Sequence, residues 1–298
     1  MQLERVRKKI KRQKSLLLML LLPVLYYVVF CYWPMYGLNI AFQKNIYGGE
    51  WVGFENFKKF LTDPYFYKTL LPNTLLLNVY SLLFAFPAPI ILALLLNELR
   101  NEKVKRVVQS ITYLPHFIST VVVCGMVVNL LASDGLVNHI MVALGMDRIQ
   151  FMMKPEYFRT IFIGSGIWQN IGWNSIIYIA AISGVSGDLY ESATIDGAGR
   201  LGKILYITLP CIAPTICIML IMAIGGILNV GVEKVLLLYN GSTYSTADVI
   251  GTYVYRRGMQ GADYSYASAV GMFQSVVGLI FLYGANWLSR KVSENSLW

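Results

Sequence analysis

Long apolar runs alternate with short polar segments along this chain. Six runs of about twenty residues or more contain no Asp, Glu, Lys or Arg, and they lie at about 15–33, 72–97, 107–133, 160–187, 206–232 and 266–289. A helix needs about 20 apolar residues to cross the roughly 30 Å hydrocarbon core of a bilayer. The runs are too long for barrel strands and do not alternate polar with apolar positions. The pattern therefore predicts an all-α integral membrane protein with six transmembrane helices.

The distribution of charge sets the expected topology. Of the 25 Lys and Arg residues, 15 fall in the short segments 1–14, 98–106, 188–205 and 290–298. Because cytoplasmic loops carry an excess of basic residues, we expect a basic cytoplasmic segment over 1–14, one membrane domain over 15–298, and both termini in the cytoplasm. The net charge of +9 is then explained by contact with anionic membrane lipid, without nucleic acid as a partner.

Residue types that carry chemistry are sparse. The four cysteines lie within or at the apolar runs without a CxxC pair, and the two histidines, His116 and His139, are far apart in sequence. No catalytic triad, metal-ligand spacing or phosphate-binding glycine loop is present in the sequence. We therefore expect no catalytic residues, no metal and no cofactor in this chain, which should not be an enzyme.

One apolar run carries a polar stripe. In the fourth run, Asn170, Asn174 and Tyr178 follow the spacing i, i+4, i+8, and Gln169 and Trp173 lie on the adjacent stripe. Amides hydrogen-bond to hydroxyl groups and aromatic rings stack on sugar faces, so the stripe is suited to a carbohydrate pathway. The same residues are equally suited to holding helices together. Both interpretations remain open from the sequence.

Two shorter segments also have helical signals. The segment 188–205 predicts a helix-turn-helix, with Asp188 as the N-cap, Gly197 and Gly199 in the turn, and a second helical piece over 200–206. The stretch GFENFKKFL, residues 53–61, predicts a short helix that lies on the outer membrane surface or packs on neighbouring loops.

The order of residues in the polar segment resembles a known signature. It matches the EAA loop of binding-protein-dependent ABC importer permeases, with Ser192 in place of the first alanine. The matching residues are Glu191, Ala193, Asp196, Gly197, Ala198, Leu209 and Pro210. The stretches PMYGLNIAFQKN and VEKVLLLYNGSTYSTADVIGTYVYRRG resemble the oligosaccharide and polysaccharide importers of the maltose-type branch, the LplB-like subfamily.

The resemblance implies a fold, a function and a set of partners. The fold is the type I ABC importer permease (MetI-like) fold, with 188–205 as the loop that couples to an ATPase. The partners are a second homologous permease, a cytoplasmic ATPase dimer that binds ATP and Mg, and an extracytoplasmic sugar-binding lipoprotein, in a bacterial cytoplasmic membrane. Because the runs lack charged residues, we expect the cargo to be a neutral oligosaccharide. A permease for another small solute, or a scaffold or sensor subunit that does not transport, remains an alternative.

Overall fold

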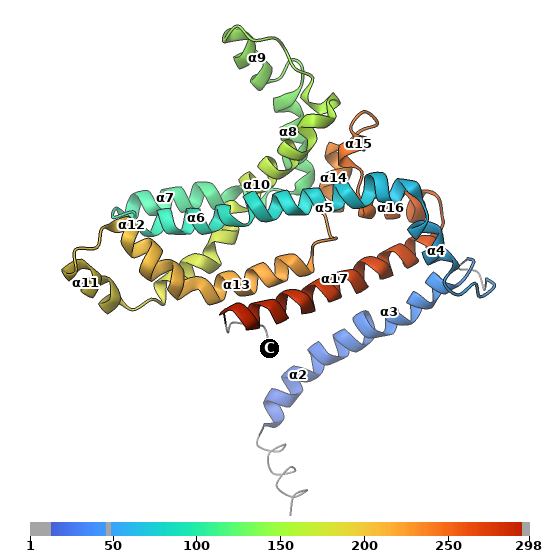
Figure 1. Ribbon diagram of the computed structural model, residues 1–298, viewed down its shortest axis with the longest axis horizontal. Coiled ribbons are helices and arrows are strands. Elements are labelled where there is room, and N and C mark those ends of the chain that lie inside the picture. Colours follow the sequence, from blue (N-terminus) through green and yellow to red (C-terminus); the bar gives the residue numbers. More distant parts are fainter. Residues whose placement is uncertain (1–12, 46–48, 294–298) are drawn as a thin grey trace, which may run out of the picture.

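Helices make up most of the computed structural model, which describes residues 13–45 and 49–293 (Figure 1). Within these ranges there is no β-strand, only an isolated bridge between Gln43 and Trp51. The predicted all-α class is therefore confirmed. The predicted cytoplasmic segment 1–14 lies almost wholly outside the described residues, as do residues 294–298.

The helices follow one another along the chain with short connections. The N-terminal run is α2 (Lys14–Tyr26), η1 (Tyr27–Tyr32), α3 (Trp33–Met35) and η2 (Tyr36–Phe42). Next come α4 (Glu55–Leu61), η3 (Phe66–Leu70), α5 (Leu71–Tyr80), η4 (Ser81–Ala85) and α6 (Pro87–Asn97). The middle of the chain forms α7 (Glu102–Tyr113), η5 (Leu114–Phe117), α8 (Thr120–Leu131), α9 (Leu136–Ala143), η6 (Phe151–Met153) and α10 (Pro155–Ser183). The remainder forms α11 (Gly187–Ile195), α12 (Arg200–Lys203), η7 (Ile204–Thr208), α13 (Leu209–Gly225), α14 (Val232–Leu238), α15 (Tyr244–Ala247), α16 (Ile250–Tyr255), η8 (Arg256–Gln260) and α17 (Tyr264–Ser293).

Five of the described helical runs are long and apolar enough to cross a membrane. They are Lys14–Phe42, Phe66–Asn97, Thr120–Ala143, Arg200–Gly225 and Tyr264–Lys291. The fourth predicted run lies in α10, which has 29 residues but is not among the five. Its three amides at 169, 170 and 174 lower the mean hydropathy, so α10 is long enough to span but more polar than the other helices.

The third predicted span, 107–133, is wrong as a single helix. The structure has α7 and α8 instead, separated by a break around Pro115. Pro115 cannot donate a backbone hydrogen bond, and the Ser119 hydroxyl accepts one from the Val122 N–H at 3.4 Å to start α8. Helix α7 packs along α10, where a Cβ on Gly172 would collide with the carbonyl group of Thr112.

The fifth predicted span, 206–232, is displaced along the chain. Its helical run starts at Arg200 and ends at Gly225, where the backbone turns towards α14. Helix α17 packs closely on this run. A Cβ added to Gly278 would lie only 2.9 Å from the carbonyl oxygen of Gly225. Glycines at this contact let the two helix backbones approach each other.

The long helices form a body from which three parts project. In Figure 1, α5, α6, α13 and α17 run alongside one another, and α10 crosses them and packs on α6 and α13. Helix α11 projects at one end of this body, α8 and α9 extend from one side, and α2 and α3 lie apart on another. The apolar window of the first helix is wholly unburied. The exposed apolar faces of these projecting parts are left for lipid or other chains to cover.

The predicted short helix over 53–61 is present as α4. Its Phe60 is 1% exposed and contacts Phe66 and Phe273 with ring centroids 5.3 and 5.1 Å apart. Helix α4 is therefore packed on α17 and η3, which favours the packed alternative over a helix that only lies on the membrane surface.

A buried ion pair organises the segment between α15 and α16. The Asp248 side chain is 0% exposed and accepts from Arg256 Nη1 and Nη2 at 2.7 and 2.6 Å. It also accepts from the Tyr65 and Thr252 hydroxyls at 2.6 and 2.7 Å. Burial and the bond to Asp248 raise the pKa of Tyr65, so its phenol remains a donor. The network joins the start of η3 to the segment before α17.

Candidate functional site

The polar segment between α10 and α13 folds into the predicted helix-turn-helix. Helix α11 begins two residues earlier than expected, and its N-cap is Ser186, whose hydroxyl accepts from the Asp188 N–H at 3.3 Å. The prediction of Asp188 as the N-cap is therefore wrong. Asp188 lies in the first turn instead, where its carboxylate interacts favourably with the helix dipole.

The end of α11 is set by a glycine. Gly197 has φ +77°, a conformation that a residue with a Cβ adopts at a cost. Its N–H donates to Thr194 O at 3.1 Å, and the Ala198 N–H donates to Ala193 O at 2.8 Å. This pair of bonds is a Schellman motif, which closes the helix and turns the chain into α12.

The hairpin of α11 and α12 is tied to the helical body at two points. The Tyr190 hydroxyl lies 2.9 Å from the Thr208 hydroxyl in η7. Arg200 at the start of α12 forms an ion pair with Glu98 at the end of α6, at 3.9 Å. Helix α12 continues through η7 into α13 without a break, so the hairpin is part of the same helical run as the fifth span.

Not all of the residues in the predicted coupling signature lie on this hairpin. Those that do are Glu191, Ala193, Asp196, Gly197 and Ala198. Leu209 and Pro210 lie in the first turn of α13, and Leu209 packs against the core around Ile212. The hairpin also presents Ile195, which is 87% exposed at the end of α11. An isoleucine at the tip of a projecting helix is a candidate contact for another chain.

The polar stripe of α10 divides into two parts. Gln169 is 8% exposed, and its Nε2 donates to Ile118 O at 3.2 Å. The Asn170 amide oxygen lies 3.0 Å from His116 Nδ1. These two residues join α10 to the break between α7 and α8, as the helix-packing interpretation expects.

The other three residues of the stripe have different surroundings. Trp173 is 43% exposed and stacks on His116, with centroids 4.5 Å apart and planes at 5°. Asn174 is exposed, and Tyr178 is 2% exposed. Asn174 and Tyr178 line a cavity of about 350 Å³, the Tyr178 cavity, together with Ala85, Phe86, Pro89, Met219, Met222 and Ala223.

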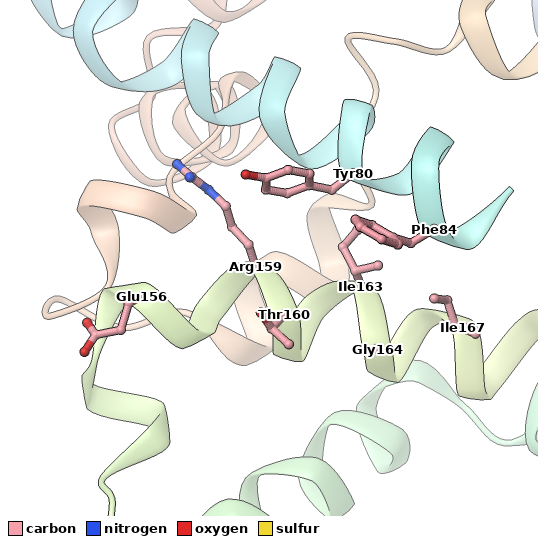
Figure 2. A pocket seen from close by; sticks show the side chains of 8 residues that line it. All are labelled: Tyr80, Phe84, Glu156, Arg159, Thr160, Ile163, Gly164 and Ile167. Carbon is pink, nitrogen blue, oxygen red and sulfur yellow. The ribbon is translucent and has the colours of Figure 1, made fainter. Parts of the chain in front are cut away.

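A larger cavity lies further towards the start of α10 (Figure 2). This Arg159 cavity has a volume of about 580 Å³ and is lined by Tyr80, Phe84, Glu156, Arg159, Thr160, Ile163, Gly164 and Ile167. Both cavities lie between α10 and the run from α5 to α6, and α13 forms a further wall of the Tyr178 cavity. The π-helical segment η4, which carries Phe84 and Ala85, contributes to both walls. Such π-bulges occur frequently at functional sites.

Sequence reasoning missed the polar and aromatic lining of the Arg159 cavity. Tyr80 and Phe84 have i, i+4 spacing, which indicated a common helix face. Arg159 lies one residue before the predicted fourth run, so the hydropathy pattern places it outside the span although α10 includes it. In the described part of the chain, no group of three or more His, Cys, Asp or Glu side chains is placed to hold a metal ion.

Comparison with known proteins gives consistent similarities over most of the chain. Residues 85–294 match the family described as binding-protein-dependent transport system inner membrane component. Protein LplB of Bacillus subtilis (strain 168) is 43% identical over 294 residues, covering 97% of this chain and 92% of that protein. The polygalacturonan/rhamnogalacturonan transport system permease protein YteP of the same strain is 44% identical over 296 residues, with the same coverage of both chains.

Solved structures show the same similarity in three dimensions. A chain of a bacterial ABC transporter involved in the import of the acidic polysaccharide alginate is 46% identical, with a TM-score of 0.90 over 97% of this chain and 99% of that chain. The alginate transporter in complex with an alginate pentasaccharide-bound periplasmic protein gives a TM-score of 0.91 over 98% and 100%, again at 46% identity.

Proposed function

Because the chain belongs to the family of binding-protein-dependent transport system inner membrane components, we propose that it is the permease subunit of an ATP-driven importer of oligosaccharides. The observation that carries this proposal is the hairpin of α11 and α12, which projects from the helical body with an apolar tip exposed. A projecting helix that is tied to two spans is suited to receive motion from another chain.

The proposed assembly has four kinds of component. Besides this chain, it contains a second homologous permease, a cytoplasmic ATPase dimer and an extracytoplasmic sugar-binding lipoprotein. The solved complex of the alginate transporter with a periplasmic protein supports an extracytoplasmic sugar-binding protein as a partner. ATP and Mg would bind to the ATPase dimer, so that this chain itself is not an enzyme. The assembly would lie in a bacterial cytoplasmic membrane, with both termini of this chain in the cytoplasm.

The proposed coupling runs through the hairpin. Closure of the ATPase dimer would displace α11, and the bonds from Tyr190 to Thr208 and from Arg200 to Glu98 would carry that displacement to α13 and α6. Both helices pack on α10. The walls of the two cavities would then move relative to each other and open to alternate sides of the membrane.

The proposed cargo is an oligosaccharide, but the expectation that it is neutral needs revision. The names of the similar proteins support a sugar, since they refer to polygalacturonan/rhamnogalacturonan and to alginate. The expectation of a neutral sugar was based on spans without charged residues. Helix α10 begins at Pro155 and therefore includes Arg159, so that argument no longer separates neutral from acidic sugars.

Affinity purification tests the proposed assembly. The tagged chain is purified from its own host after mild solubilisation, and the proteins that accompany it are identified by mass spectrometry. We expect a second permease and an ATPase. Recovery of the chain alone, or with only a regulatory protein, would contradict the proposal and favour a scaffold or sensor subunit.

Substitutions on α10 separate its two groups of polar residues. Trp173→Ala and Asn174→Ala are expected to lower oligosaccharide uptake by about two- to tenfold. A ring stacked on an aromatic side chain contributes about 0.5–1.5 kcal/mol. Assembly should not be lost, because both side chains are exposed. Gln169→Ala serves as the contrast, since it leaves the part-buried carbonyl group of Ile118 without its donor and should lower the thermal midpoint. Dissociation of the Asn174→Ala complex would instead assign that residue to helix packing.

A further inference from the structure

The guanidinium group of Arg159 has a buried donor that the described residues do not satisfy. Its Nη2 donates to Asn73 Oδ1 at 2.9 Å. Its Nε is buried and has no hydrogen-bond partner among the described residues. No ion pair within the described part of the chain involves Arg159. A buried charged donor without an acceptor is costly, so the group is suited to a ligand that brings an anion.

Asn73 holds this guanidinium in a fixed orientation. The Asn73 Nδ2 donates to the backbone carbonyls of Ser245 and Asp248, both at 3.1 Å. Carbonyl oxygens only accept, which assigns the amide nitrogen to that side and directs Oδ1 towards Arg159. Asn73 is 2% exposed. The guanidinium is therefore positioned before any ligand arrives, which lowers the entropy lost on binding.

The other charged group in the wall does not neutralise Arg159. Glu156 lines the same cavity one turn earlier, and Figure 2 shows its carboxylate directed away from the guanidinium. The guanidinium and the Tyr80 hydroxyl lie on the same side of the cavity in that view. The fork of N–H groups on an arginine matches the two oxygens of a carboxylate.

The rest of the wall is suited to a sugar ring. Tyr80 and Phe84 offer aromatic faces, and Thr160 adds a hydroxyl group. The volume of about 580 Å³ lies within the range of about 300–1,000 Å³ that is usual for ligand pockets. We propose that the Arg159 cavity binds an acidic sugar unit, with the carboxylate of a uronate on the Arg159 guanidinium. This inference rests on the proposed function and specifies its substrate class.

The first test uses the wild-type complex with its partner subunits in nanodiscs, without the binding protein. Short oligomers of galacturonate and mannuronate are added, each beside its methyl ester, which has the same ring but no charge. We expect the acids to raise the thermal midpoint and the esters not to do so. The effect of the acids should decline as salt is added.

The second test compares variants in an uptake assay with binding protein present. Arg159→Gln is expected to lower uptake of the acidic oligomer by about ten- to a hundredfold, the usual range for a hydrogen bond to a charged group, and to spare the ester. Arg159→Lys keeps the charge without the fork and should be intermediate, and it carries the test if the Gln variant does not fold. Lys154→Gln removes an exposed charge immediately before α10 and should change nothing.

The outcomes separate this inference from the function on which it rests. Two results overturn the acidic-sugar assignment and leave oligosaccharide import in place. One is an equal rise of the thermal midpoint with acid and ester, and the other is an equal loss of acid and ester uptake in Arg159→Gln. Stabilisation by phosphatidylglycerol that the uronates do not displace would assign the cavity to lipid and also overturn it. If the wild-type complex hydrolyses ATP but imports neither these oligosaccharides nor a panel of neutral ones, the proposed function fails with it.

Discussion

Glu191→Lys is expected to reduce ATP-driven uptake at least about tenfold while the chain still inserts into the membrane and folds. Glu191 is exposed on α11, so the substitution leaves no buried partner unsatisfied. It reverses a charge on the surface proposed to dock on the ATPase, and like charges at an interface cost several kcal/mol. Uptake and ATP hydrolysis are measured on complexes matched for expression.

Glu102→Lys is the control for this substitution. Glu102 lies in the first turn of α7, and its side chain is 68% exposed. The substitution makes the same charge reversal outside the hairpin, and we expect near-normal uptake. Unaltered uptake in Glu191→Lys, or an equal loss in both variants, would count against the docking role of α11.

Asp248→Asn is expected to destabilise the chain by about 3–5 kcal/mol, the usual cost of removing one partner of a buried ion pair. The variant keeps the shape of the side chain but leaves the Arg256 charge without its carboxylate. It also turns an amide NH₂ towards groups that are themselves donors. The thermal midpoint of the purified complex should fall on the order of 10 °C.

Tyr65→Phe gives a graded comparison at the same network. It removes one of the hydrogen bonds to Asp248 and leaves the ion pair intact. We expect a loss of about 1–3 kcal/mol, smaller than that of Asp248→Asn. An Asp248→Asn variant as stable as the wild type would show that the ion pair does not hold the segment between α15 and α16.

Local signals predicted the hairpin well. Two glycines between helical stretches indicated the turn, and the structure places Gly197 at φ +77° in the closing motif. The cap was misassigned because Ser186 and Asp188 are both good N-caps, and only the backbone geometry distinguishes them. The exposed Ile195 was not recognised, since its exposure depends on how far α11 projects from the body.

Features that depend on tertiary packing could not be predicted in the same way. The apolar run over 107–133 does not show that its first part packs along α10 through Gly172 as a separate helix. Pro115 and Ser119 were the available signals for the break. The Arg159 cavity depends on contacts between residues far apart in sequence, such as Asn73 with Arg159 and with Asp248, and hydropathy carries no information on these.

Reconstitution tests the central claim most directly, namely that this chain forms the membrane path of an ATP-driven oligosaccharide importer. The complex is placed in proteoliposomes with ATP in the lumen and with the binding protein and a labelled oligosaccharide outside. We predict accumulation of the sugar against its gradient, lost when ATP is omitted. Uptake that proceeds equally without ATP, or no uptake by an assembled complex that hydrolyses ATP across a panel of acidic and neutral oligosaccharides, would contradict the account.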